Sequence, residues 1–136
     1  MIVVDASVAV KWFIPETGSD KAETLLYNTE RLFAPEIIRL EVAGAISRLY
    51  RMDVIQHDDA MDLCQEWSRF IKQGAMALSS VNTDYHRAVD LSIELKHPIA
   101  DCLYLAVAER LKIPVFTADK AMADQAKILG LNTTLF

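Results

Sequence analysis

Short apolar segments rich in β-branched residues alternate along this chain with longer segments in which apolar residues recur at helical spacing. The short segments have the length and composition of buried strands. Strands that alternate with helices are typical of a parallel sheet covered by helices on both faces. The pattern therefore predicts an α/β fold, a three-layer α/β/α sandwich. The predicted strands are Ile2–Val4, Leu32–Ala34, 75–81 (weak, because of its Ala and Ser), Pro114–Thr117 and Thr133–Leu135.

Capping residues and prolines predict where the helices begin and end. Pro15 closes a helix that starts after Asp5, and Ser19 is a plausible N-cap of the next. Pro35 suits the first position of a helix, and Pro98 opens another. The predicted helices run from Asp5 to Pro15 and over 19–29, 35–52, 57–72, 82 or 83 to 96, 98–111 and 120–129.

Length and composition indicate one compact domain over residues 1–136, since 52% of the residues are hydrophobic and only 4 are Gly and 4 Pro. No apolar run reaches the roughly 18 residues of a membrane span, and the opening residues lack the pattern of a signal peptide. Cys64 and Cys102 are far apart in helical patterns. We expect them to be buried free thiols, which suits a reducing cytoplasm.

The net charge of −5 is unusual for a protein that binds nucleic acid, because affinity for a polyanion normally comes from Lys and Arg. Two interpretations remain open at this point. Either the partner is not a nucleic acid, or the excess acid is concentrated where a cation neutralises it.

Two aspartates stand just past the carboxyl end of a predicted strand, where α/β sheets place their working sites. Asp5 follows the first strand, and Asp119 follows the strand that ends at Thr117. Each aspartate also precedes a helix, so each is equally explained as a helix N-cap.

Two further carboxylates lie in apolar helical surroundings. Glu41 has Ile37, Ile38 and Ala45 as its neighbours three and four residues away, whereas a purely solvating glutamate would more often lie on the opposite face. Asp101 is the only charge in the apolar run 99–108. A buried carboxylate must be paired, hydrogen-bonded or bound to a cation. The alternative for Asp101 is a favourable place in the first turn of a helix.

Taken together, the four acids need positive charge between them, and the basic residues in these segments are too few to supply it. A hard divalent cation such as Mg²⁺ or Mn²⁺ takes oxygen ligands of this kind, and such a site activates water for phosphodiester hydrolysis. Ser7 and Thr117 each lie two positions from a site acid and offer a hydroxyl to support it. Local capping explains these two hydroxyls equally well.

The segments that carry these residues resemble the PIN-domain nucleases, and most of all the single-domain toxins of the virulence-associated protein C (VapC) type. They are the opening Val-Val-Asp-Ala-Ser of residues 3–7, the helix Pro-Glu-Ile-Ile-Arg-Leu-Glu-Val of 35–42, the block that starts at Asp101, and Thr-Ala-Asp-Lys of 117–120. They occur in the family's order, and the resemblance covers the whole chain.

The resemblance implies a parallel five-stranded sheet between helices, dependence on Mg²⁺ or Mn²⁺, and cleavage of RNA. It implies that Asp5, Glu41, Asp101 and Asp119 are the metal-binding and catalytic acids, with Thr117 at the family's Ser/Thr position. It also implies a homodimer and a cognate antitoxin, for which Trp12, Phe13, Leu25, Leu26 and Tyr27, or Trp67 and Phe70, offer apolar area. Ordinary core packing is the alternative for these side chains.

Several alternatives remain. The chain could be a PIN fold that binds RNA or protein without cutting, or an RNA-processing nuclease that is not a toxin. A haloacid-dehalogenase-type phosphotransferase requires an acid where Ser7 stands, and a receiver requires a pair of early acids. Catalysis by a Cys or Ser nucleophile is unsupported, since His57, His86 and His97 occupy polar or turn contexts and are expected at the surface.

Contacts with the phosphates of RNA are predicted for a few basic residues. Arg48 lies two helical turns from Glu41 on nearly the same face, which makes it the first candidate. The others are Lys11, Arg39, Arg51 and Lys120. Such contacts position RNA without specifying its sequence, so the RNA target is not identified by these residues.

Overall fold

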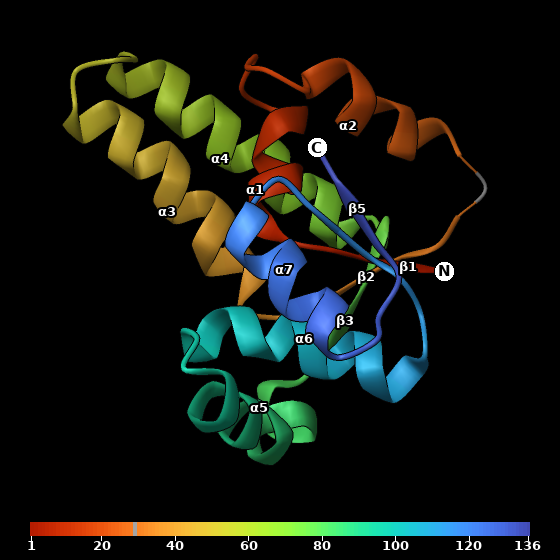
Figure 1. Ribbon diagram of the computed structural model, residues 1–136. Helices are drawn as coiled ribbons and strands as arrows, with labels where there is room; N and C mark the ends of the chain where they lie inside the picture. The colour runs from red at the N-terminus through yellow and green to blue at the C-terminus, as the bar shows by residue number, and fades with distance from the viewer. Residues whose placement is uncertain (29) are drawn as a thin grey trace.

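The computed structural model describes residues 1–28 and 30–136 and shows a five-stranded, fully parallel sheet in the order β3-β2-β1-β4-β5 (Figure 1). The strands are β1 (Ile2–Val4), β2 (Leu32–Pro35), β3 (Met76–Ser79), β4 (Val115–Thr117) and β5 (Thr133–Leu135). The helices are α1 (Ala6–Ala9), the 3₁₀ turn η1 (Val10–Trp12), α2 (Ser19–Tyr27), α3 (Ile38–Arg51), α4 (His57–Lys72), α5 (Val81–Leu95), α6 (Ile99–Leu111) and α7 (Lys120–Ile128).

The order of the strands explains the three layers. The chain moves from β1 to β2 and β3 in one direction and then returns to β4 and β5 on the other side of β1. Because parallel crossovers are right-handed, this reversal sends the later helices to the opposite face of the sheet. Figure 1 accordingly shows α1 to α4 on one side and α5 and α6 on the other. The predicted α/β/α sandwich with about five parallel strands is confirmed.

The core is built on the two faces of the short strands and on α6. Val3 and Val4 of β1 and Val115 of β4 are fully buried. Seven successive residues of α6, Cys102 to Ala108, are buried as well, because this helix lies between the sheet and α5. Burial on all sides explains why its sequence lacks the polar stripe of a surface helix.

Some predicted boundaries were wrong by a few residues. Pro35 ends β2 instead of opening a helix, because its pairing with Ser79 extends β2 alongside β3, and α3 starts at Ile38. The N-cap of α5 is Ser80, whose hydroxyl accepts the Asn82 N–H, in place of Asn82 or Thr83. For α2 the N-cap is Gly18, at φ 87°, and Ser19 is the first helical residue. The predicted end of that helix, at residue 29, lies outside the described residues.

Most of the aromatic residues offered as partner surfaces belong to the core. Trp12 packs on Phe70 with ring centroids 5.2 Å apart, and Phe13 meets the edge of Trp67 at 5.7 Å. The indole nitrogens of Trp12 and Trp67 donate to the carbonyls of Ala22 and Arg39. Ordinary core packing therefore accounts for these rings, whereas Tyr27 is 79% exposed.

Among the residues that the structure describes, no helix combines the length and the apolar character needed to cross a membrane.

Candidate active site

Asp5 is held at the junction of β1 and α1, beside the reversal of strand order. Its Oδ1 accepts the Ser7 hydroxyl at 2.6 Å and the Val8 N–H at 3.2 Å, and its Oδ2 accepts the Thr117 hydroxyl. The residue is only 3% exposed. Burial therefore raises the pKa of Asp5 from 3.8 to about 6, although these hydrogen bonds lower it and the charge of Asp101 adds to the rise.

Ser7 and Thr117 join Asp5 to the end of β4. The two hydroxyl oxygens lie 3.4 Å apart, the Ser7 hydroxyl accepts the Ala118 N–H at 2.9 Å, and the Thr117 hydroxyl accepts the Asp119 N–H at 3.0 Å. The hydroxyls thus contact Asp5 and also fix the turn that carries Asp119. They serve the carboxylate and the local backbone together, so the two interpretations of these hydroxyls are compatible.

Asp119 caps α7 with one oxygen. Its Oδ1 accepts the backbone N–H groups of Ala121 and Met122 at 2.8 and 3.3 Å. The other oxygen, Oδ2, is not needed for this cap. Asp119 and Asp5 are therefore both helix N-caps, and the capping role leaves each of them at the carboxyl ends of adjacent strands.

Glu41 lies in the first turn of α3 and is tied to α6 on the other face of the sheet. The Tyr104 hydroxyl donates to its Oε1 at 2.6 Å. Partial burial raises the pKa of Glu41, the bond from Tyr104 lowers it, and the charge of Asp101 raises it further. Tyr104 itself is 1% exposed, so this hydrogen bond also satisfies a hydroxyl in an otherwise apolar helix.

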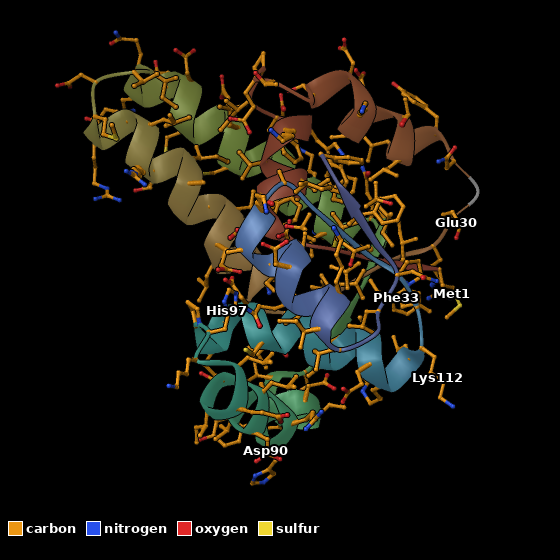
Figure 2. All side chains as sticks on the ribbon, viewed as in Figure 1. Met1, Glu30, Phe33, Asp90, His97 and Lys112 are labelled. Carbon is orange, nitrogen blue, oxygen red and sulfur yellow. The ribbon has the colours of Figure 1, made fainter. Side chains whose placement is uncertain are left out.

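Asp101 lies one turn after His97, whose imidazole Nε2 is 3.1 Å from the Asp101 Oδ2 (Figure 2 labels His97, just before α6). This contact becomes an ion pair when the imidazole is protonated. The His97 side chain is 9% exposed, and the expectation that it lies at the surface was therefore wrong. Burial raises the pKa of Asp101, His97 lowers it and Asp119 raises it.

Asp101 is the common neighbour of the other three acids. Its negative charge raises the pKa of both Asp5 and Glu41, and the charge of Asp119 raises the pKa of Asp101 in turn. Shifts of this kind require charges within several ångströms of one another. The fold thus brings together side chains from four segments that are up to 114 positions apart in the sequence.

The four carboxylates do not close on a common point in this conformation. Within residues 1–28 and 30–136, no three Asp, Glu, His or Cys side chains come close enough to form a metal site as they stand. Like charges repel, and each carboxylate is turned toward a donor of its own. The composition of the cluster nevertheless fits a hard divalent ion, because it offers oxygen ligands and an excess of negative charge.

Tyr104 and His97 are the two contacts that the sequence interpretation missed. Tyr104 has a polar atom three residues after Asp101 in a wholly apolar run, and His97 stands four residues before Asp101. The spacing of three residues places Tyr104 on the same face of α6 as Asp101, and this is the signal that would have found it. His97 precedes Pro98, the N-cap of α6, so helical spacing gives no such signal for it.

The predicted phosphate contacts divide into two groups. Arg48 and Arg51 line a groove of about 530 Å³ that also contains Glu41. Lys11 is committed elsewhere, since its ammonium pairs with Glu16 at 3.1 Å and donates to the Thr17 carbonyl. A phosphate contact at Lys11 would have to replace this pairing, and it stays a prediction. A larger hollow of about 630 Å³ between α3 and α4 contains none of the four acids, so chemistry rather than size locates the site.

Comparison with known proteins relates this geometry to a family. The family model described as "PIN domain" matches residues 2–128. "Ribonuclease VapC9" of Mycobacterium tuberculosis is 30% identical over 91% of this chain and 90% of its own length. The crystal structure of M. tuberculosis VapC20, described as a sarcin-ricin loop cleaving toxin, superposes with a TM-score of 0.68 at 14% identity, covering 91% of this chain and 94% of that one. A chain of a toxin-antitoxin complex from Klebsiella pneumoniae gives a TM-score of 0.62 at 15% identity, covering 88% and 87%.

Proposed function

The chain belongs to the PIN domain family, and from that premise we propose that it is a Mg²⁺- or Mn²⁺-dependent endoribonuclease that hydrolyses phosphodiester bonds of RNA. Asp5, Glu41, Asp101 and Asp119 hold the metal and carry the catalysis. The observation that supports this most is that Asp5 and Asp119 lie at the carboxyl ends of the adjacent strands β1 and β4, with Asp101 near enough for its charge to raise the pKa of Asp5 and Glu41. The 30% identity to a protein named a ribonuclease supports the reaction.

The protein's own residues aim these carboxylates. Ser7 and Thr117 orient Asp5, and the N-terminus of α7 orients Asp119. Tyr104 fixes the direction of Glu41, and the imidazole of His97 contacts Asp101 at 3.1 Å. The bound ion would activate a water and screen the charge of the phosphate. Because the ion would neutralise the four acids, they would no longer repel the phosphates of RNA. A net charge of −5 is then compatible with an RNA substrate.

We expect cleavage of single-stranded RNA to require Mg²⁺ or Mn²⁺ and to stop in EDTA, because without a cation the four acids repel phosphate. The measurement is product formation from end-labelled RNA with each ion and with EDTA. Robust cleavage in EDTA would contradict the mechanism. Tight RNA binding without cleavage in any ion would favour instead a PIN fold that binds RNA or protein.

We further propose that the protein acts in the cytoplasm, as a homodimer and as the toxin of a toxin–antitoxin pair. The relative VapC20 is described as a toxin, and the Klebsiella structure is a toxin-antitoxin complex. The two free cysteines suit a reducing compartment. The exposed side chains of Leu26 and Tyr27 on α2 offer apolar area for a partner.

Expression of the chain alone is expected to arrest growth, and co-expression of a small protein encoded beside it is expected to relieve the arrest. Uncontrolled RNA cleavage is the cause, so Asp101→Asn should be harmless at the same expression level. Growth curves with matched protein amounts test this. Harmless expression of a folded, RNA-cleaving wild type would favour an RNA-processing nuclease that is not a toxin.

A further inference from the structure

We propose that the groove between η1 and the outer half of α3 binds the RNA strand beside the scissile bond, with Arg48 and Arg51 contacting its phosphates. This inference rests on the proposed nuclease function and adds the path of the substrate. The groove has a volume of about 530 Å³ and runs from Glu41 to the two arginines. One end therefore belongs to the acid cluster, and the other end is cationic.

The charge of these arginines is uncompensated in the described chain. Arg87 is paired with Glu109, and Arg110 is paired with Asp84 at 2.8 Å. Arg48 and Arg51 take part in no salt bridge among the described residues, although acids outnumber bases by 19 to 14. The groove is also lined by Glu16, but this carboxylate is already paired with Lys11 at 3.1 Å. The two unpaired arginines are therefore the charges in the groove that are complementary to an anion from outside.

The spacing along α3 suits a nucleic-acid strand. Arg48 and Arg51 follow Glu41 by seven and ten residues, which at 1.5 Å per residue places them about 10 and 15 Å along the helix. The arginines thus lie far enough from Glu41 to contact phosphates next to the scissile bond and not the bond itself. Phosphate contacts at such a distance hold the strand in register.

The walls of the groove are suited to the bases and riboses of an RNA strand. Val10, Ile14, Leu49 and Met52 give it apolar sides, against which bases and riboses can lie without sequence preference. Gly44 lines the groove between Glu41 and Arg48, and a Cβ added there would meet nothing within 4 Å. Packing therefore does not require a glycine at position 44. Its missing side chain leaves the floor of the groove open.

A helix-terminal role is the competing explanation for the arginines, since both lie in the last turn of α3, where cations favour the helix dipole. An acidic segment of a protein partner is a second competitor. RNA is favoured over the segment because the groove opens directly on the acid cluster that would cut it. The two competing explanations predict different changes in KM and in antitoxin binding for the variants described next.

The test compares wild type with Arg48→Gln/Arg51→Gln on an RNA of about a dozen nucleotides centred on a bond that the wild type cuts, in Mn²⁺. We expect KM to rise roughly tenfold or more, since two charge-assisted contacts are lost. The slope of log kcat/KM against log salt should become shallower by about 1.4, at about 0.7 per single-strand contact. Cleavage of a minimal phosphodiester that is too short to reach the arginines should be unchanged.

Matched variants separate charge, space and stability. Arg69→Gln/Lys72→Gln removes the same charge from the exposed side of α4 and should leave KM unchanged. Gly44→Leu keeps both arginines but fills the groove, and it should raise KM as the double variant does. Because Gly44 has open space and glycine disfavours helices, this variant should fold at least as stably as the wild type. Gly44→Ala is the mild control.

An arginine double variant with unchanged KM and salt slope would overturn the inference while leaving the nuclease function intact. A double variant that cleaves RNA normally but fails to bind the antitoxin would assign the groove to the protein partner and overturn it likewise. A wild type that cleaves neither RNA nor the minimal diester in any metal would remove the proposed function and this inference together.

Discussion

Asp101→Asn is expected to lower RNA cleavage by at least about a hundredfold while leaving the metal-free protein no less stable than the wild type. The loss of activity follows because a metal ligand is removed from the transition state. The stability follows because Asp101 is partly buried among like charges that raise its pKa, so the ionised form is disfavoured in the fold. Asparagine keeps the shape and removes that charge.

The competing interpretation of Asp101, a helix-terminal acid stabilised by His97, gives the opposite result. Loss of the contact at 3.1 Å would then cost roughly 1 kcal/mol or more, and activity would follow the amount of folded protein. Urea midpoints in EDTA and cleavage rates in Mn²⁺ answer both questions with one variant. Asp62→Asn, on the exposed side of α4, is the matched control for loss of one negative charge.

Stability of the metal-free protein is expected to fall as the pH rises from about 4 to above 6, because of Asp5. Its pKa is raised from 3.8 to about 6 in the folded state. The folded protein therefore binds more protons than the unfolded chain in this window. The stabilisation that protonated Asp5 contributes is complete below about pH 4 and is lost above about pH 6. A shift of about two units corresponds to a maximum of about 3 kcal/mol. Burial raises the pKa of Glu41 and Asp101 in the same direction.

Other carboxylates with the opposite shift, such as Glu109 beside Arg87, partly mask this trend in the wild type. The difference in unfolding free energy between the wild type and Asp5→Asn isolates the contribution of Asp5. We expect the wild type to lose stability relative to the variant between pH 4.5 and 7.5 in EDTA, and Mn²⁺ to restore it at pH 7.5 by binding the folded state. A difference in unfolding free energy that is flat across this range would contradict the raised pKa of Asp5.

The centre of the sheet was predictable from the sequence because β1 is fully buried and its neighbours β2 and β4 are mostly buried. Burial on both faces gives continuous apolar runs such as Ile2–Val4, and these runs alternate with segments of helical periodicity. Boundaries were less predictable where tertiary pairing decided them. Pro35 has the local features of a first helical residue, yet pairing with β3 keeps it in a strand. Such pairing depends on a residue 44 positions away and leaves no local signal.

The acids of the candidate site could be proposed from the sequence because they follow predicted strands or interrupt apolar helical segments, where an unpaired carboxylate would be destabilising. Their partners could not be located in the same way. Helical spacing places Tyr104 on the same face of α6 as Asp101, but it does not show that Tyr104 reaches Glu41 across 63 positions. The pairing of Lys11 could not be predicted either, because it depends on the turn at 15–18, which brings Glu16 and the Thr17 carbonyl back to its ammonium. A positive φ at Gly18 permits that turn.

Binding of Mn²⁺ is the measurement that tests the metal site most directly, since the four acids are proposed to be its ligands. Free Mn²⁺ can be counted by electron paramagnetic resonance while protein is titrated at pH 7.5. We predict saturable binding by the wild type and by Asp62→Asn, and binding weakened severalfold or more in both Asp5→Asn and Asp101→Asn. Equal Mn²⁺ affinity in wild type, Asp5→Asn and Asp101→Asn would contradict a metal site built from these carboxylates.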